Sequence, residues 1–157
     1  MASTPTFYYA VAKYGYDGGL QVSASHNPAQ YNGFKMTRAR AGAISGDSGI
    51  KEIRNLAEKN EFTPAKISGG LSIKRGVLEE QVSEALRVVD MAKIKPFKIV
   101  IDTANSMGSL MMEELFKHLP GELIKLNWEL DGSFPNHEAD PFKDKNNKQL
   151  QEKIIAE

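Results

Sequence analysis

The stretch FKIVIDTANSMGSLMMEELFKHLPGELIKLNW, residues 97–128, decides the fold because it places a helix pattern between two strand patterns. FKIVID, residues 97–102, is a nearly continuous apolar run, which is typical of a strand buried on both faces. A helix is predicted from about Ser106 to His118, and GELIKLNW, residues 121–128, predicts a second strand. A strand, a helix and a strand in this order predict a right-handed βαβ unit with parallel strands.

The segments on either side of this unit are helical or polar. Residues 130–145 are expected to form a polar loop, and residues 146–157 are expected to begin a last helix. A helix is also predicted ahead of the unit, because apolar residues recur there on one face of a helix. These residues are Leu78, Val82, Ala85, Leu86 and Val89.

The first third of the chain begins with a helix and continues with strands. STPTFYYAVAKYG, residues 3–15, has Ser3 or Thr4 as a helix cap, and Pro5 suits the first helical position. GGLQVSAS, residues 18–25, alternates apolar and polar residues, as a half-buried strand does. Asn32-Gly33 is a turn signal, and a second strand is expected to follow it. A further helical spacing runs from Ile50 to Asn60.

Composition excludes several classes of protein. The 157 residues contain 20 basic and 20 acidic side chains, so nothing in the charge balance indicates a nucleic-acid partner. No apolar run approaches the ~20 residues that span a bilayer, and the N-terminus lacks a signal-peptide pattern. Cysteine is absent, which fits a reducing compartment. We therefore expect a cytoplasmic protein without a nucleic-acid or membrane partner.

The segment VSASHNPAQYNGFK, residues 22–35, carries the candidate chemistry. Pro28 keeps Asn27 out of the helical region, so Ser25 is expected in a loop at the end of a strand. Side chains of adjacent residues in an extended chain point to opposite sides, so His26 is not expected to hydrogen-bond the Ser25 hydroxyl. A hydroxyl with loop amides and Lys35 nearby suits phosphoryl transfer, where positioning and charge neutralisation dominate. The alternative for Ser25 is a capping or turn role.

A second candidate is NHEAD, residues 136–140, whose His137, Glu138 and Asp140 are metal-ligand types. No recognised metal-ligand spacing is present. We therefore interpret this segment as a solvated loop.

The segment ASHNPAQYNGFK, Ala24 to Lys35, closely resembles the phosphoserine signature of the α-D-phosphohexomutases, the phosphomannomutase/phosphoglucomutase family. STPTFYYAVA is similar to the helix that precedes the active serine in this family. KIVIDTANSMG and LNWELDGSFPNHEADP resemble the opening of the family's second domain. The resemblance covers nearly the whole chain and is weakest from about Arg38 to Gly76.

The resemblance implies an α/β fold with two partial three-layer α/β/α units of the phosphohexomutase type. Residues 1–76 would be the latter part of domain I with the active-serine loop. Residues 77–157 would be the linking helix and the first part of domain II. The opening strands of domain I, the aspartate-rich magnesium loop, the sugar loop and the C-terminal phosphate loop of the family are not found in the chain.

The resemblance also implies roles for individual residues. Ser25 would be the phosphoserine, which exchanges its phosphoryl group with a hexose phosphate through a bisphosphorylated sugar. His26 and Lys35 would contact the reacting oxygen or move its proton, and Asn27 would shape the loop and help to bind phosphate. The alternatives are loop packing for His26 and a solvated strand position for Lys35.

The resemblance further implies Mg²⁺, with one phosphoserine oxygen of Ser25 as a ligand, but the family's aspartate ligands are not present. Asp102, Asp131, Asp140 and Asp144 do not reproduce the motif. We therefore expect this chain alone to be inactive and to hold Mg²⁺ weakly. The rival hypothesis is a non-catalytic assembly or phosphate-binding module that keeps the scaffold.

The two sheets implied by the resemblance are incomplete, and this predicts that the chain associates with itself. Two partial sheets leave unpaired backbone groups along their edges and apolar faces with partial cover. We expect a homodimer, formed by sheet extension or by exchange of an element through Gly69-Gly70.

Overall fold

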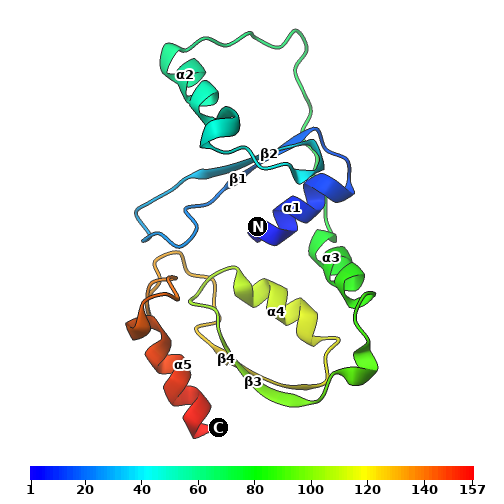
Figure 1. Cartoon of the computed structure of the whole chain (residues 1–157), viewed down its shortest axis with the longest axis vertical. Coiled ribbons are helices and arrows are strands. Elements are labelled where there is room, and N and C mark those ends of the chain that lie inside the picture. Colours follow the sequence, from blue (N-terminus) through cyan, green and yellow to red (C-terminus); the bar gives the residue numbers. More distant parts are fainter.

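The computed structural model describes residues 1–157 and has two α/β units, which confirms the predicted fold class (Figure 1). The first unit contains α1 (Thr4–Lys13), β1 (Gly18–Val22), β2 (Phe34–Arg38) and α2 (Lys51–Lys59). The second contains α3 (Val77–Leu86), β3 (Phe97–Asp102), α4 (Gly108–Phe116), β4 (Gly121–Leu126) and α5 (Asp144–Ala156). Short helical turns lie at Ala39–Ala41, Gly46–Ile50 and Met91–Lys93. None of the helices has the length and apolar character that a membrane span requires.

The first unit is a hairpin covered on one face by α1. The N-cap of α1 is Ser3, whose hydroxyl accepts the Thr6 N–H, and Pro5 lies in the first turn as predicted. β1 and β2 are antiparallel, with Val22 opposite Phe34. Gly19 lets α1 approach the sheet, because a Cβ there would lie 2.5 Å from the Phe7 ring.

The prediction of a turn at Asn32-Gly33 is wrong. The Ser23 N–H donates to the Gly33 carbonyl at 2.9 Å, which extends the hairpin ladder one step beyond the Val22–Phe34 pair. Gly33 is therefore part of the paired backbone, and the chain turns earlier, at residues 25–26 and 29–30.

The second unit contains the predicted βαβ unit. β3 and β4 are parallel, with Phe97 opposite Gly121 and Asp102 opposite Leu126, and α4 connects them. The expectation that β3 is buried on both faces is wrong. Phe97 is 60% exposed and no residue of the strand is fully buried, because this sheet has only two strands.

The two units meet where α1 lies beside α3. The Tyr14 hydroxyl of α1 donates to Glu80 Oε2 of α3 at 2.5 Å, and this bond raises the pKa of Tyr14 to about 12. Lys13 forms ion pairs with Glu84 and Glu80 of α3. Lys74 lies over the Tyr14 ring, 4.4 Å from its centroid. α3 also packs against α4, so it joins the two units.

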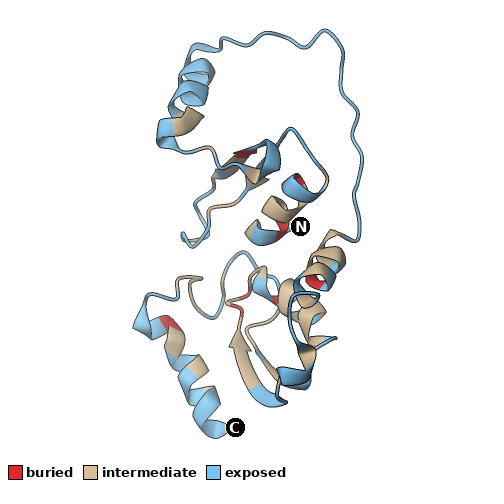
Figure 2. Cartoon of the chain, turned by 45° about the vertical axis from the view of Figure 1, so that its right-hand side comes forward, coloured by how far each residue is buried: buried red, intermediate tan, exposed pale blue.

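Burial is sparse throughout the chain (Figure 2). Val11 of α1 and Val82 of α3 are the only fully buried apolar residues. α2 and the segment that follows it, residues 60–75, are exposed and extend away from both sheets. The core is therefore small and lies along α1 and α3.

Candidate functional site

The Ser25 loop connects the two strands of the hairpin. Ser25 itself has a backbone φ of 58°, a left-handed conformation that costs a non-glycine residue on the order of 1 kcal/mol or more. The Ser23 hydroxyl accepts the Ser25 N–H at 3.1 Å, and the Asn27 side chain donates to the Ala24 carbonyl at 2.7 Å. These bonds hold the loop so that the Ser25 side chain is exposed at its tip.

His26 does lie within hydrogen-bonding distance of Ser25, which corrects the sequence-based inference. The distance between Ser25 Oγ and His26 Nδ1 is 3.1 Å. The inference assumed an extended backbone, whereas the left-handed φ of Ser25 begins a turn that brings neighbouring side chains to the same side. When Nδ1 carries no proton, it can accept the proton of the serine hydroxyl.

Lys35 does not contact Ser25 in this structure. Its Nζ donates to Thr4 Oγ1 at 3.1 Å, in the first turn of α1. Thr4 in turn donates to Gln21, which is opposite Lys35 in the hairpin. The first turn of α1 contains no acidic residue, so the Lys35 cation adds to the positive end of a helix dipole. An anion at this position would be stabilised by both.

Asn27 shapes the loop rather than presenting a free amide. Both its backbone N–H and its side-chain amide donate to the carbonyl of Ala24, at 3.2 and 2.7 Å. The phosphate-binding role suggested by the resemblance would require this side chain to turn.

A cavity of about 1460 Å³ lies between the two units and receives Ser25, His26 and Lys35. Residues 1–7 of the first unit line it, as do residues 74–79, which lead into α3. The second unit contributes residues 101–104, 106–108, 134 and 137–141. Its cationic groups include Lys74 and Arg75. A cavity lined by cations, a helix N-terminus and a hydroxyl suits a phosphorylated ligand.

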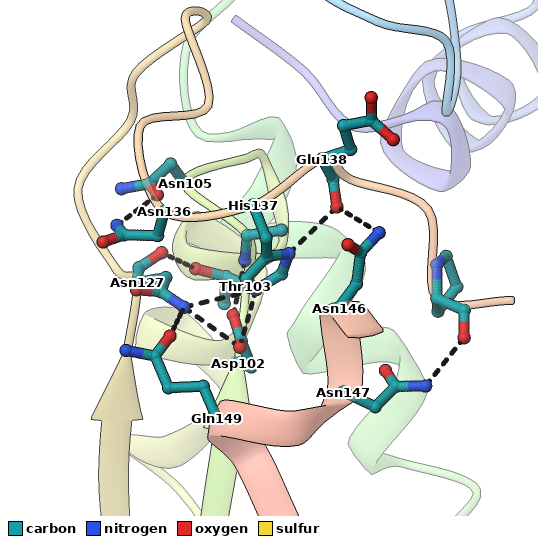
Figure 3. A network of polar contacts seen from close by, with 12 residues as sticks. Asp102, Thr103, Asn105, Asn127, Asn136, His137, Glu138, Asn146, Asn147 and Gln149 are labelled. Carbon is teal, nitrogen blue, oxygen red and sulfur yellow. Dashed lines mark hydrogen bonds and ion pairs between the residues drawn. The ribbon is translucent and has the colours of Figure 1, made fainter. Parts of the chain in front are cut away.

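The opposite side of the cavity is a polar network at the carboxyl ends of β3 and β4 (Figure 3). His137 Nε2 lies 2.9 Å from Asp102 Oδ2, and Asn127 donates to the same oxygen at 3.0 Å. The interpretation of NHEAD as a solvated loop is wrong for His137, whose side chain is only 15% exposed. Its carboxylate partner comes from a distant strand, so local sequence could not reveal it.

Four residues with left-handed backbone also lie in this network or beside it, and the sequence analysis missed them. Two of the four are asparagines, a residue type that adopts this conformation more often than most others: Asn105 of the β3–α4 loop and Asn127 after β4. They are Ala104, Asn105, Asn127 and Phe134.

The residues present do not make a magnesium site. No group of three or more acidic, histidine or cysteine side chains lies close enough together to hold a metal ion. Three of the carboxylates that line the cavity are engaged elsewhere: Asp102 pairs with His137, and Glu138 and Asp140 pair with Lys143. The Ser25 oxygen alone does not provide the octahedral oxygen set that Mg²⁺ requires.

Two family models match the chain. Residues 1–64 match phosphoglucomutase/phosphomannomutase, alpha/beta/alpha domain I, and residues 78–157 match alpha/beta/alpha domain II. A phosphomannomutase of Vibrio cholerae is 41% identical over 147 residues, which cover 90% of this chain and 32% of that protein. A phosphomannomutase/phosphoglucomutase of Pseudomonas aeruginosa is 35% identical and covers 100% of this chain and 32% of its own length.

A solved structure shows the same arrangement of elements. A phosphoglucomutase/phosphomannomutase family protein of Burkholderia thailandensis superposes with a TM-score of 0.84 at 31% identity. The match covers 100% of this chain and 34% of that protein. The chain thus spans about one third of the length of the relatives that it matches.

Proposed function

Because this chain belongs to the phosphoglucomutase/phosphomannomutase family, we propose that it is the active-serine segment of a hexose phosphate mutase. Ser25 is the residue that carries the phosphoryl group. The single observation that carries this proposal is the geometry of the serine. Its hydroxyl is exposed in the cavity, lies 3.1 Å from a histidine nitrogen, and belongs to a residue held at a φ of 58°.

The residues of the chain support a two-step transfer. The phosphoryl group leaves Ser25 Oγ for a hydroxyl of a hexose monophosphate, and the proton of that hydroxyl passes to Ser25 Oγ, with His26 Nδ1 as the carrier. The resulting bisphosphorylated sugar then turns over, and Ser25 Oγ attacks its other phosphorus. His26 Nδ1 takes the serine proton in this second step and gives it to the sugar oxygen that leaves the phosphorus. Lys35, Lys74 and Arg75 offset the phosphate charge from the side of the cavity.

A specific observation also supports the rival function, a phosphate-binding module without catalysis. The cavity has cations and a helix N-terminus but no cluster that could hold the metal. The two functions differ in one respect: only the mutase segment forms a covalent bond to Ser25.

Covalent labelling tests this difference. We expect a hexose 1,6-bisphosphate with Mg²⁺ to transfer a phosphoryl group to Ser25 slowly and in substoichiometric yield, because the chain lacks a complete metal site. Intact-mass measurement followed by peptide mapping would detect it. The label should disappear in Ser25→Ala and persist in the control Ser68→Ala, which lies in the exposed segment after α2. Label that survives Ser25→Ala would contradict the proposal, and reversible binding without label would support the rival.

We also propose that the chain forms a homodimer. A compact monomer of 17.4 kDa would expose about 7,900 Å², whereas this chain exposes 11360 Å². The excess of about 3,500 Å² is larger than one partner's share of a standard interface, roughly 800 Å². The apolar residues of α2 and of the segment after it supply a surface for the second copy. These residues are Ile53, Leu56, Phe62, Ile67, Leu71 and Ile73.

Charge favours a second copy as the occupant of this surface. The charged residues of α2 are of both signs, and Arg54 lies 3.5 Å from Glu58. Two copies of such a helix meet without net repulsion of the kind that a single-sign surface would cause.

Light scattering after size exclusion over a dilution series would measure the association. We expect a dimer that Leu56→Lys converts to monomer, because the substitution places a charge in the apolar contact. Glu52→Gln is the control, since it makes the charge of the same helix more positive by one unit, as Leu56→Lys does, without removing an apolar contact. If Leu56→Lys does not affect the dimer, the two copies associate through the open sheet edges instead. A monomer at every concentration would contradict the proposed association.

A further inference from the structure

The loop that follows β4 is attached to β3 through one histidine. Residues 127–143 leave the end of β4, cross the carboxyl end of β3 and lead into α5. His137 lies near the middle of this loop and faces Asp102, the last residue of β3. Both side chains are largely withdrawn from solvent, with 15% and 7% exposure, and both residues line the cavity that receives Ser25.

Each ring nitrogen of His137 faces an acceptor. Nε2 lies 2.9 Å from Asp102 Oδ2, and Nδ1 lies 2.9 Å from the backbone carbonyl oxygen of Glu138 (Figure 3). A neutral imidazole has one N–H, so one of these contacts would bring a nitrogen lone pair against an oxygen lone pair. Only the imidazolium, with hydrogens on both nitrogens, makes both contacts favourable.

Asn127 does not offer an alternative donor to the ring. Its side-chain amide has two hydrogens, and these are directed at Asp102 Oδ2, 3.0 Å away, and at Gln149 Oε1, 2.8 Å away. The same amide nitrogen also lies 3.3 Å from His137 Nε2, but it has no third hydrogen to donate to the ring. Because Asp102 accepts the Asn127 amide at Oδ2 and the Ala104 N–H at Oδ1, its carboxylate acts as an acceptor, and we place the proton between the two side chains on His137.

The charged groups around His137 leave Asp102 as its one direct partner. On its own loop, Glu138 and Asp140 direct their carboxylates to Lys143. From α5, Asn146 and Gln149 contribute neutral amides. Asp102 also accepts the Ala104 N–H at 2.8 Å, so its carboxylate is fixed. Burial opposes the histidine charge, but the bonds to the Glu138 carbonyl and to Asp102 outweigh it and raise the pKa of His137 above 6.5.

We propose that His137 is a positioning residue that, when protonated, holds the 127–143 loop against the end of β3. It thereby fixes one side of the cavity that contains Ser25, and loss of its proton releases that side. This inference does not depend on what the cavity binds.

The direction of the pH effect follows from the sign of the shift. A histidine whose pKa is higher in the folded state stabilises that state below the pKa of the unfolded chain. This contribution disappears as pH rises through the folded pKa of His137. The loop is therefore held at pH values below the folded pKa of His137 and is released as pH rises through that pKa.

Two measurements on the whole chain test the proposal. In an NMR titration, the His137 ring proton should titrate with a midpoint above 6.5 and be assigned by its absence in His137→Gln. In hydrogen exchange corrected for intrinsic rates, amides of residues 129–140 should lose roughly tenfold or more protection above that midpoint, as expected for a lost charge-assisted hydrogen bond. Amides of β3 and β4 should keep their protection.

Variants separate the proposal from a merely structural role. Asp102→Asn should lower the midpoint and move the exchange transition to lower pH with it. His118→Gln is the matched control, because His118 is an exposed histidine of the same unit and should leave both readouts unchanged. If His137→Gln does not fold, the resonance can be assigned in the unaltered chain by subtracting those of the other two histidines. A midpoint at or below 6.5, or loop protection that does not change across it, would overturn the proposal.

Discussion

The isolated chain is expected to give no measurable conversion of mannose 1-phosphate or glucose 1-phosphate to the 6-phosphate in a coupled assay. Phosphoryl transfer depends on a metal and on several groups that hold the phosphates, and this structure has no cluster that could hold the metal. Each lost electrostatic contact of this kind lowers the rate by about 10²–10³-fold. Ordinary turnover by the purified chain would contradict this account.

A chimera in which this chain replaces the matching third of a full-length relative is expected to be catalytically active. The chain aligns along its whole length with one third of the Pseudomonas aeruginosa relative, and this is the third that it would replace in the chimera. We expect the chimera to turn over hexose phosphates and Ser25→Ala to lower the rate by on the order of 10⁶-fold, as removal of a nucleophile does. Ser68→Ala should leave the rate unchanged. Activity that survives Ser25→Ala would remove the serine from the mechanism.

The largest effect on stability is expected at Gly121, the first residue of β4. Its φ is 113°, and a Cβ there would lie 2.4 Å from the Phe97 carbonyl oxygen of β3. Gly121→Ala therefore strains the backbone and pushes the paired strands apart, and we expect the free energy of unfolding to fall by roughly 2–5 kcal/mol.

Urea unfolding followed by circular dichroism would measure this loss. Gly132→Ala is the matched control, because a Cβ there meets no atom within 4 Å and the residue lies in the exposed loop after β4. Equal midpoints for the two variants would show that the β3–β4 contact does not depend on the glycine.

Local patterns were sufficient to predict most of the helices and strands. The cap at Ser3, the alternation in β1 and the strand–helix–strand order of residues 97–126 each depend on residues that are close in sequence. The burial of β3 was predicted incorrectly because burial depends on how many strands and helices cover a sheet. A sheet of two strands leaves Phe97 exposed whatever the apolar pattern indicates.

The candidate site was harder to predict because its geometry is set by backbone conformation and by distant partners. The left-handed φ of Ser25 brings the side chains of Ser25 and His26 within hydrogen-bonding distance, whereas an extended backbone would separate them. The residue types in that loop do not predict this φ. Lys35 reaches Thr4, which lies 31 positions earlier in the chain. The pairing of His137 with Asp102 spans 35 positions and depends on the parallel register of β3 and β4.

Mapping the phosphoenzyme would show whether Ser25 carries the phosphoryl group. The chimera would be quenched during turnover, digested and examined by tandem mass spectrometry. We expect phosphate on the peptide that contains Ser25, located at that residue and absent from the Ser25→Ala chimera. Phosphate on another residue, or an active chimera with no phosphoserine at this position, would contradict it.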